Sequence, residues 1–313
     1  MAIDKSKLVN YVNANKDIIL KNTLFGAPSI ELFSKMTNVK GDANLNLLDT
    51  TVSFGDGKTC GWADNAESKL STRKLETAII KVDAAFCQRA LSKYWAGEEL
   101  NQKIGIETLP QEDKFVSDLV TKISEKMEGM LYYGDKTNSS ETQFDGICTI
   151  AIAEAANTAS TINKVTATSA QTMYTRIGNV IEAIPSKFYN ESIVLLSTTS
   201  FRKAIKEFET ANPYKTLEFV GEDKMEFIYP NTNIHVKGVA GMDTNTATRK
   251  EDIISIVPRL TFYGADYEEA AEEYRFEYFS HDDQFEYHSL WNSGTQFAYM
   301  DSVVWCATPT ANA

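Results

Sequence analysis

Histidine is scarce in this chain, with only three among 313 residues. The three, His235, His281 and His288, show neither H-x-x-x-H nor H-E-x-x-H spacing, so the usual zinc-enzyme motifs are absent. His281 precedes Asp282 and Asp283, and we interpret this stretch as a solvated hairpin turn and not as a metal site. A serine or cysteine nucleophile would also have few histidines to act as its base. We therefore predict no catalytic, cofactor-binding or metal-binding residue and no enzyme activity.

Cysteine is nearly as scarce, with four residues spread along the chain. Cys60, Cys87, Cys148 and Cys306 are too far apart for a C-x-x-C metal or redox pair. A secreted protein of this size more often carries a disulfide framework. We expect four buried or half-buried free thiols in a reducing cytoplasm.

Basic residues are outnumbered, because 31 Lys and Arg stand against 43 Asp and Glu and give a net charge of −12. Phosphate backbones attract the opposite sign, so sequence-specific nucleic-acid binding is not expected. Nine of the acids lie between residues 266 and 287, where Arg275 is the only base. Four glutamates there predict a solvated face, or an interface that takes up basic residues from a neighbouring subunit. The glutamates are Glu268, Glu269, Glu272 and Glu273, and the candidate basic partners are Lys69, Arg73 and Lys74.

Long apolar runs and phosphate-binding motifs are also missing. No stretch approaches the roughly 18 apolar residues that a membrane span needs. The first 22 residues lack the apolar core and cleavage site of a signal peptide, so we expect assembly inside a cell and no membrane partner. The segment GDGKT at 55–59 lacks the glycine spacing of a phosphate loop before Lys58 and Thr59, and we predict no nucleotide binding.

The first half of the chain contains an arm, a ribbon and a long helix. Residues 4–22 have near-helical apolar spacing but are rich in Asn and Lys, and we interpret them as an exposed arm that gains structure against a partner. Strand-like arms at 45–54 and 72–82 flank a polar, glycine-containing middle. A ribbon of two strands is marginally stable alone, so we expect a neighbouring subunit to pack on it. Residues 111–133 predict the clearest helix, with Pro110 before it and Gly134 at its exit.

The second half alternates helices and strands. Helices are predicted at 172–184, before Pro185, and at 201–208, after the capping candidates at 197–200. Short strands are predicted at 192–196 and within 233–242. Strands at 253–263, 274–280, 285–291 and 295–305 predict one closing antiparallel sheet.

Four stretches of the sequence, together with this order of elements, carry a resemblance to a known family. They are FDGICTIA at 144–151, SIVLLSTTSFRKAI at 192–205, YPNTNIHVKGVAGM at 229–242, and the closing segment at 260–305. In the closing segment, Tyr263, Gly264 and Asp266 precede an acidic and aromatic hairpin and a final strand that begins near Gly294. Together the pattern resembles the major capsid proteins of tailed bacteriophages, the Hong Kong 97-like fold.

The resemblance implies an α+β protein with an N-terminal arm, an extended two-stranded loop, a peripheral domain with a long spine helix, and an α/β axial domain. The implied divisions are an arm at 1–46, the loop at 47–84, the peripheral domain at 85–145 with its spine helix at 110–134, the axial domain at 146–252, a closing antiparallel sheet at 253–306 that rejoins the peripheral domain, and a tail at 307–313. It also implies self-assembly as hexamers and pentamers, with axial domains at their centres, into an icosahedral head around double-stranded DNA.

The implied partners follow from the same resemblance. Only 46 residues precede the loop, which is too few for the fused scaffold of some members, so we expect a separate scaffolding protein or none. A portal and decoration proteins would complete a virion head that assembles in the cytoplasm of a bacterial host. Some members form a lysine–asparagine crosslink, and although Lys58 and Lys69 lie in the loop, neither is assigned a reactive role.

Two other functions stay open at this point. Bacterial encapsulins share the fold, so a nanocompartment shell that encloses a metabolic enzyme is the nearest alternative. A soluble cytoplasmic enzyme with a site assembled from scattered residues is the third. Particle size and content would separate a phage capsid from an encapsulin shell. A strictly monomeric protein would contradict both kinds of shell.

Overall fold

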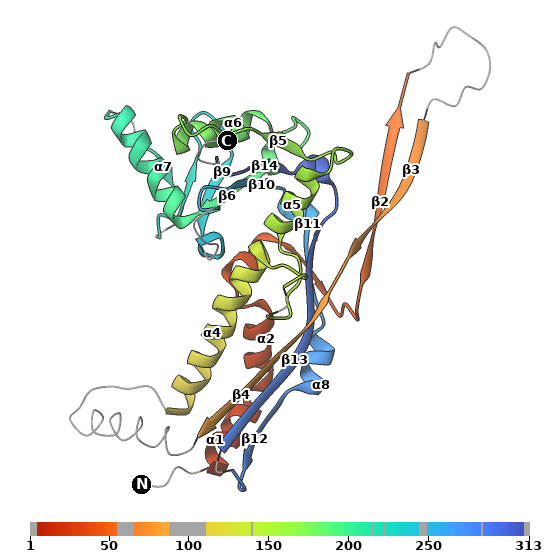
Figure 1. Ribbon diagram of the computed structural model, residues 1–313, viewed down its shortest axis with the longest axis vertical. Helices are drawn as coiled ribbons and strands as arrows, with labels where there is room; N and C mark the ends of the chain where they lie inside the picture. The colour runs from red at the N-terminus through yellow and green to blue at the C-terminus, as the bar shows by residue number, and fades with distance from the viewer. Residues whose placement is uncertain are drawn as a thin grey trace.

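Two β-sheets, a cover of helices and a projecting ribbon make up the computed structural model (Figure 1). The structure describes residues 5–54, 66–87, 111–138, 140–214, 216–221, 223–243, 249–282 and 284–309. Helices occur together with sheets whose strands pair mostly antiparallel, which agrees with the predicted α+β class. Short 3-10 helices connect them: η1 (Pro28–Leu32), η2 (Tyr189–Glu191), η3 (Ala240–Asp243), η4 (Pro258–Leu260) and η5 (Met300–Ser302).

A seven-stranded sheet forms the middle layer of the upper half in Figure 1. Its strands, in spatial order, are β5 (Asn163–Val165), β14 (Val304–Cys306), β10 (Ile253–Ile256), β6 (Ile193–Ser197), β9 (His235–Val239), β8 (Glu226–Ile228) and β7 (Glu218–Phe219). The helices that cover it are α6 (Met173–Glu182) and α7 (Thr198–Ala211) on one face, and α4 (Gln111–Tyr133) and α5 (Ile147–Ala156) toward the other. Strand β6 serves both faces, because Val194 and Leu196 pack with α6 and α7 while Leu195 packs in the cluster that includes α4 and α5.

Local capping explains where α6 and α7 begin. The Thr172 hydroxyl accepts a hydrogen bond from the Thr175 amide at 3.2 Å, and the Ser197 hydroxyl accepts one from the Ser200 amide at 3.2 Å. The helices predicted at 172–184 and 201–208 are confirmed, although the second begins earlier because Ser197 is its N-cap. The strand predicted at 192–196 and the helix predicted at 111–133 are confirmed as β6 and α4.

A five-stranded sheet runs through the lower half and is organised around one long strand. Its strands are β1 (Ser34–Thr37), β11 (Thr261–Ala265), β13 (Gln284–Phe297), β12 (Arg275–Phe279) and β4 (Ala78–Cys87). β4 pairs along one edge of β13, while β12 and β11 share the other edge and β1 adds in parallel to β11. One face of this sheet packs against α4 and the N-terminal helices α1 (Lys5–Ala14) and α2 (Lys16–Phe25), and α8 (Tyr267–Glu273) links β11 to β12.

The prediction of an exposed N-terminal arm is wrong for the segment that α2 and η1 occupy. Leu20, Leu24 and Ile30 are fully buried in the same core cluster as α4 and the five-stranded sheet. The apolar spacing continues past residue 22, where the prediction ended, and Leu24 and Ile30 complete an apolar side that must be covered. The segment is therefore part of the core of the subunit.

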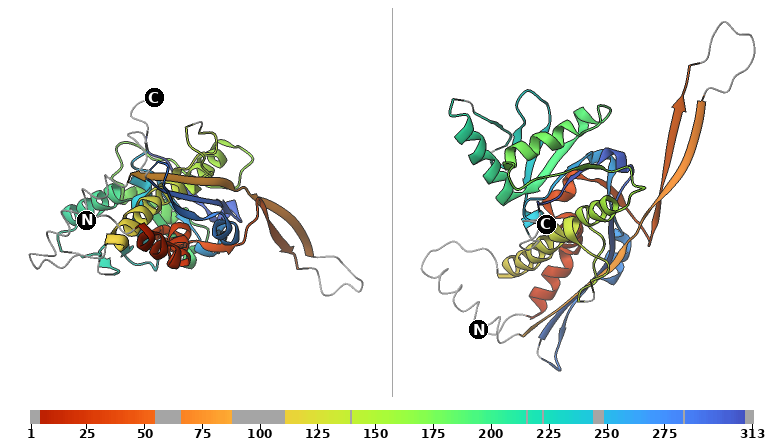
Figure 2. Two further views of the ribbon diagram at one scale, coloured as in Figure 1. Left: turned by 90° about the horizontal axis from the view of Figure 1, so that it is seen from below. Right: turned by 45° about the horizontal axis from the view of Figure 1, so that its top comes forward.

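The two-stranded ribbon exists, but its second strand differs from the prediction. Strands β2 (Ala43–Val52) and β3 (Ala66–Leu75) pair over their full length and project away from the body in every view (Figure 2). Residues 78–82, expected in the ribbon, instead begin β4 of the five-stranded sheet. The backbone carbonyl of Glu76 lies 2.2 Å from where a Cβ of Gly294 would stand, so a glycine in β13 permits this turn between the strands.

The closing strands do not form one sheet, contrary to the prediction. β10 and β14 belong to the seven-stranded sheet, whereas β11, β12 and β13 belong to the five-stranded sheet. Pro258 has no amide proton for a ladder, and the turn of η4 that begins there carries the chain from one sheet to the other. η5 interrupts the last predicted strand in the same way. Within the described ranges, no helix has both the length and the apolar composition for crossing a membrane.

Candidate assembly surfaces

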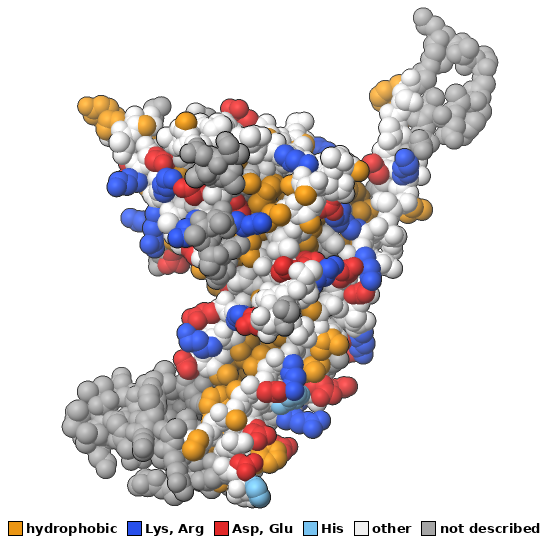
Figure 3. Space-filling model, in the orientation of Figure 1, with side chains coloured by type: hydrophobic (Ala, Val, Ile, Leu, Met, Phe, Trp, Pro, Cys, Tyr) orange, Lys and Arg blue, Asp and Glu red, His pale blue; other side chains and the backbone are white. Residues whose placement is uncertain are grey.

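The projecting ribbon has two unlike faces. Leu48 lies opposite Leu70 on one face, and Asp49 lies opposite Lys69 on the other. Leu48 is 59% exposed, Leu70 81% and Val52 59%, although all three are large apolar side chains. Apolar side chains are visible along the ribbon in the space-filling view (Figure 3). The stripe of Leu48, Val52 and Leu70 is hereafter called the apolar stripe.

The root of the ribbon shows which face turns toward the body. Leu45 is buried and Leu47 packs on the core cluster of the seven-stranded sheet. Because side chains alternate along a strand, these two residues share the face of Asp49 and not that of Leu48. The apolar stripe therefore points away from its own subunit.

The three bases proposed for contacts with a neighbouring subunit lie on or near the ribbon. Lys69 is exposed within β3. Arg73 forms an ion pair with Glu154 of α5, and Lys74 forms one with Asp42 at 2.6 Å. Two of the three bases thus have acidic partners within their own chain, and their pairing with another subunit stays a prediction.

The glutamates of α8 form a largely solvated face, as predicted from their spacing. Glu268 is 56% exposed at its side chain, forms an ion pair with Lys40 at 3.1 Å, and accepts a hydrogen bond from the side-chain amide of Asn38 at 3.3 Å. Glu272 is exposed and Glu273 is half-buried. The side chain of Glu269 lies outside the described residues.

Each histidine stands beside a carboxylate. His235 lies 2.5 Å from Glu226, and His288 lies 2.6 Å from Asp83. His281 lies 2.8 Å from Asp282 in the turn between β12 and β13, where a hairpin was predicted. No group of three or more metal-ligating side chains is found in the part of the chain that the structure describes. Asp283 and the GDGKT segment at 55–59, with Lys58 and Thr59, lie outside it.

Two cysteines are buried as expected and one is not. Burial raises the pKa of the Cys148 and Cys306 thiols, so both are protonated and unreactive at neutral pH. Cys87 is exposed, which contradicts the expectation. The alternating exposure of β4 explains this, because Cys87 shares the outer face of that strand with Lys81 and Asp83. Cys60 lies outside the described residues.

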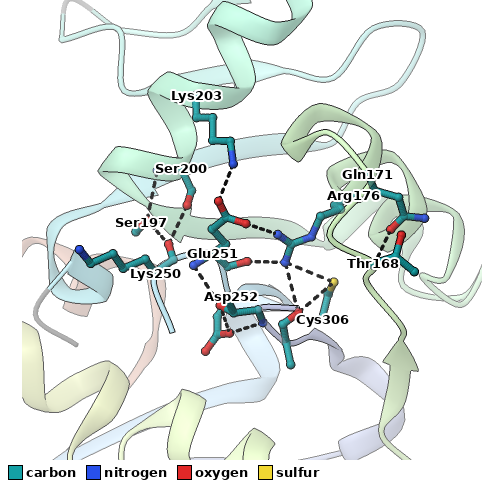
Figure 4. Close-up of polar contacts among 12 residues, drawn as sticks. Thr168, Gln171, Arg176, Ser197, Ser200, Lys203, Lys250, Glu251, Asp252 and Cys306 are labelled. Carbon is teal, nitrogen blue, oxygen red and sulfur yellow. Dashed lines mark hydrogen bonds and ion pairs between the residues drawn. The ribbon is translucent and has the colours of Figure 1, made fainter. Parts of the chain in front are cut away.

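A buried polar network joins α6 to the end of the chain (Figure 4). The guanidinium of Arg176 has only 1% of its side chain exposed, forms an ion pair with Glu251 at 2.8 Å, and donates to the Glu251 and Ala307 carbonyls at 2.6 and 3.2 Å. Lys203 of α7 pairs with the other oxygen of the Glu251 carboxylate. The sequence interpretation missed Arg176, although a charged residue among Met173, Ile177 and Val180 on one helical face is a visible signal.

The neighbouring carboxylate, Asp252, connects this network to α4. Its oxygens accept the Thr308 amide at 2.6 Å, the Thr308 hydroxyl at 2.7 Å and the Tyr133 hydroxyl at 3.1 Å. Burial raises the pKa of Asp252, against the hydrogen bonds from Thr308 and Tyr133, which lower it. The described contacts pair acids with bases, hydroxyls and amides, an arrangement that holds elements together.

Sequence comparison finds no relative, since no family model matches this chain and no curated protein matches it. Solved structures do match. A chain in the satellite phage P4 procapsid with the size determination (Sid) protein covers 97% of this chain and 97% of its own length, at 10% identity and a TM-score of 0.60. A chain of Gordonia phage Cozz covers 90% of this chain and 86% of its own, at 11% identity and 0.58. A chain of Mycobacterium phage Bobi covers 93% of this chain and 91% of its own length, at 11% identity and a TM-score of 0.57.

The chain has the Hong Kong 97-like capsid fold. The match extends over most of each chain, and the fold that the sequence resemblance implied is therefore confirmed. At about a tenth of positions identical, the likeness is one of fold.

Proposed function

We propose that this protein is the major capsid protein of a tailed bacteriophage, which self-assembles as hexamers and pentamers into the icosahedral head around double-stranded DNA. Its role is structural and not enzymatic. The observation that carries the proposal is the ribbon of β2 and β3, which stands clear of the body and turns the apolar stripe of Leu48, Val52 and Leu70 outward.

Exposed apolar side chains on an isolated ribbon favour docking on another protein surface. A two-stranded ribbon has little stability of its own in water. Removing one leucine side chain from water contributes about 2 kcal/mol. Many copies of one chain in a closed shell give every ribbon the same kind of partner surface.

The proposal also covers the divisions of the subunit. The peripheral division is built around α4 and the five-stranded sheet, and the axial division around the seven-stranded sheet, with axial divisions meeting at the centres of hexamers and pentamers. The ribbon of β2 and β3 would contact a neighbour. The segregation of the strands into two sheets, with α4 and α5 packed between them, supports this division.

The partners in the proposal are other proteins of a virion. A separate scaffolding protein, a portal and decoration proteins would act on the head during assembly in the cytoplasm of the bacterial host. DNA would be enclosed without sequence-specific contacts, and the net charge of −12 supports weak binding to phosphate.

Electron microscopy and light scattering of the purified chain test the proposal. We expect capsomers or shells at high concentration. Leu70→Glu should raise the concentration needed for assembly more than tenfold, because about 2 kcal/mol of apolar burial is lost per subunit. Ser71→Glu, on the opposite face of the same strand, is the control and should assemble like the parent.

Two outcomes would overturn the proposal. A strictly monomeric chain under all conditions contradicts a shell of any kind. Small particles that form around an enzyme instead of DNA would identify an encapsulin-like compartment.

A further inference from the structure

We propose that Arg73 is a positioning residue that sets the direction of the ribbon before any partner is bound. Through its contacts with Glu154 of α5 and Gln296 of β13, it fastens the root of the ribbon to the body. These three residues are called the root latch. The inference rests on the proposed function only for what the ribbon docks on.

The root latch holds β3 by side chain and backbone together. The Arg73 guanidinium pairs with the Glu154 carboxylate, and its Nε donates to the Gln296 side-chain oxygen at 3.2 Å. The Gln296 amide nitrogen donates in turn to the backbone carbonyl of Lys74 at 2.8 Å. Two elements of the body thus grip adjacent residues of one ribbon strand.

Other contacts at the root are more exposed to water. Lys74 and Asp42 pair at 2.6 Å with 53% and 41% of their side chains exposed, and Lys136 and Glu76 pair at 2.6 Å with 53% and 50% exposed. Arg73 and Glu154 are 25% and 22% exposed. Solvent and salt weaken exposed ion pairs most, so among these ion pairs the sheltered one of the root latch contributes most to holding the ribbon.

Burial would raise the pKa of Glu154, but hydrogen bonds from Ser160 and Arg73 outweigh it and hold the pKa below its ordinary value. The carboxylate is therefore charged at neutral pH and available to the Arg73 guanidinium.

Beyond its root the ribbon has little to hold it. From Leu48 outward on β2, and from Thr72 outward on β3, every residue whose exposure the structure describes is exposed. Among described residues, the ribbon contacts the body through ion pairs and side-chain hydrogen bonds at its root. The outermost of these is the hydrogen bond from the Tyr299 hydroxyl to the Leu48 carbonyl at 3.1 Å. The direction of the free part therefore depends on the root.

A preset direction matters because docking a mobile ribbon costs conformational entropy. A ribbon that is already aimed loses less freedom when it binds, so the net free energy of docking is more favourable. Without the root latch, the same apolar stripe would bind from a wider range of directions and more weakly.

Distance measurement by electron spin resonance on the free, full-length chain tests the inference. Ketone-bearing amino acids at Thr50, on the ribbon, and Glu209, on α7, take nitroxide labels without involving the native thiols. The parent should give a narrow distance distribution, and Arg73→Gln a distribution about twofold wider. Glu154→Gln removes the ion pair but leaves the hydrogen bond from Arg73 to Gln296, so it should widen the distribution by a smaller amount.

The controls separate positioning from damage to the fold. Lys126→Gln removes the exposed ion pair with Glu141, away from the ribbon, and should leave the width unchanged. The swapped double variant Arg73→Glu with Glu154→Arg should restore the narrow distribution. Equal widths for the parent, Arg73→Gln and Glu154→Gln, with urea midpoints unchanged, would overturn the inference.

Failure of the inference and failure of the proposed function give different results. The distances are measured on unassembled subunits, so a chain that never forms shells contradicts the capsid proposal and leaves the root latch standing. A chain that forms shells, but whose variants show an unchanged distance distribution, supports the capsid proposal and contradicts the root latch.

Discussion

Glu251 is held by two bases whose surroundings differ sharply. Arg176 reaches one of its oxygens from inside the molecule with 1% of its side chain exposed, whereas Lys203 reaches the other with 48% exposed. A buried charge has lost its water and depends on its protein partners, while an exposed one exchanges them for water at little cost. The same carboxylate therefore gives a strong and a weak contact.

Replacing each base by methionine measures this difference. Arg176→Met should lower the free energy of unfolding by about 3 kcal/mol, because Glu251 and the Ala307 carbonyl lose a buried donor. Lys203→Met is the control and should cost less than about 1 kcal/mol. Urea denaturation of unassembled subunits gives both values, and equal losses for the two variants would contradict the argument.

At the scale of helices and strands, the sequence predicted those features that residues close together in the chain determine. α6 and α7 could be located from apolar spacing and from Thr172 and Ser197, because caps act within a few residues. The point where the ribbon ends and the five-stranded sheet begins could not be located from the sequence. It depends on Gly294 of β13, which leaves room for the turn at Glu76. Sequence alternation alone is the same on both sides of that turn.

The candidate surfaces follow the same rule. Exposed strands could be expected, but the apolar stripe depends on the register that sets Leu48 against Leu70. The root latch joins Arg73 to Glu154, 81 positions away, and no spacing in the sequence signals such a contact. Long-range pairing decides both features.

The cap of α7 gives a prediction at this scale. The Ser197 hydroxyl accepts from the Ser200 amide and donates to the Lys250 carbonyl at 2.8 Å. Ser197→Ala should destabilise the subunit by about 1 kcal/mol, because a helix donor loses its acceptor. Thr210→Ala, in the exposed last turn of the same helix, should change stability by less than about 0.5 kcal/mol. A thermal melt that ranks the two variants the other way round would reject the capping role.

For the molecule as a whole, the seven-stranded sheet joins two cores. Leu196 faces the cluster with α6 and α7, and its neighbour Leu195 faces the cluster with α4 and the five-stranded sheet. In β14, Trp305 lies in the cluster with α4 and its neighbour Cys306 lies in the cluster with α6 and α7. Because one set of strands forms a wall of both cores, neither core can open without exposing the sheet of the other.

This shared wall predicts that the two halves unfold together. Cys148 lies in the cluster with α4 and Cys306 in the other cluster, so thiol labelling followed separately at these two cysteines by mass spectrometry should give the same urea midpoint for both. Leu196→Ala should cost about 2–5 kcal/mol and shift both midpoints by the same amount, although Leu196 faces only one core. Leu48→Ala, on the exposed ribbon, is the control and should shift neither. Separate midpoints, or a shift at Cys306 alone, would mean that the sheet belongs to one half and that the half with α6 and α7 opens independently.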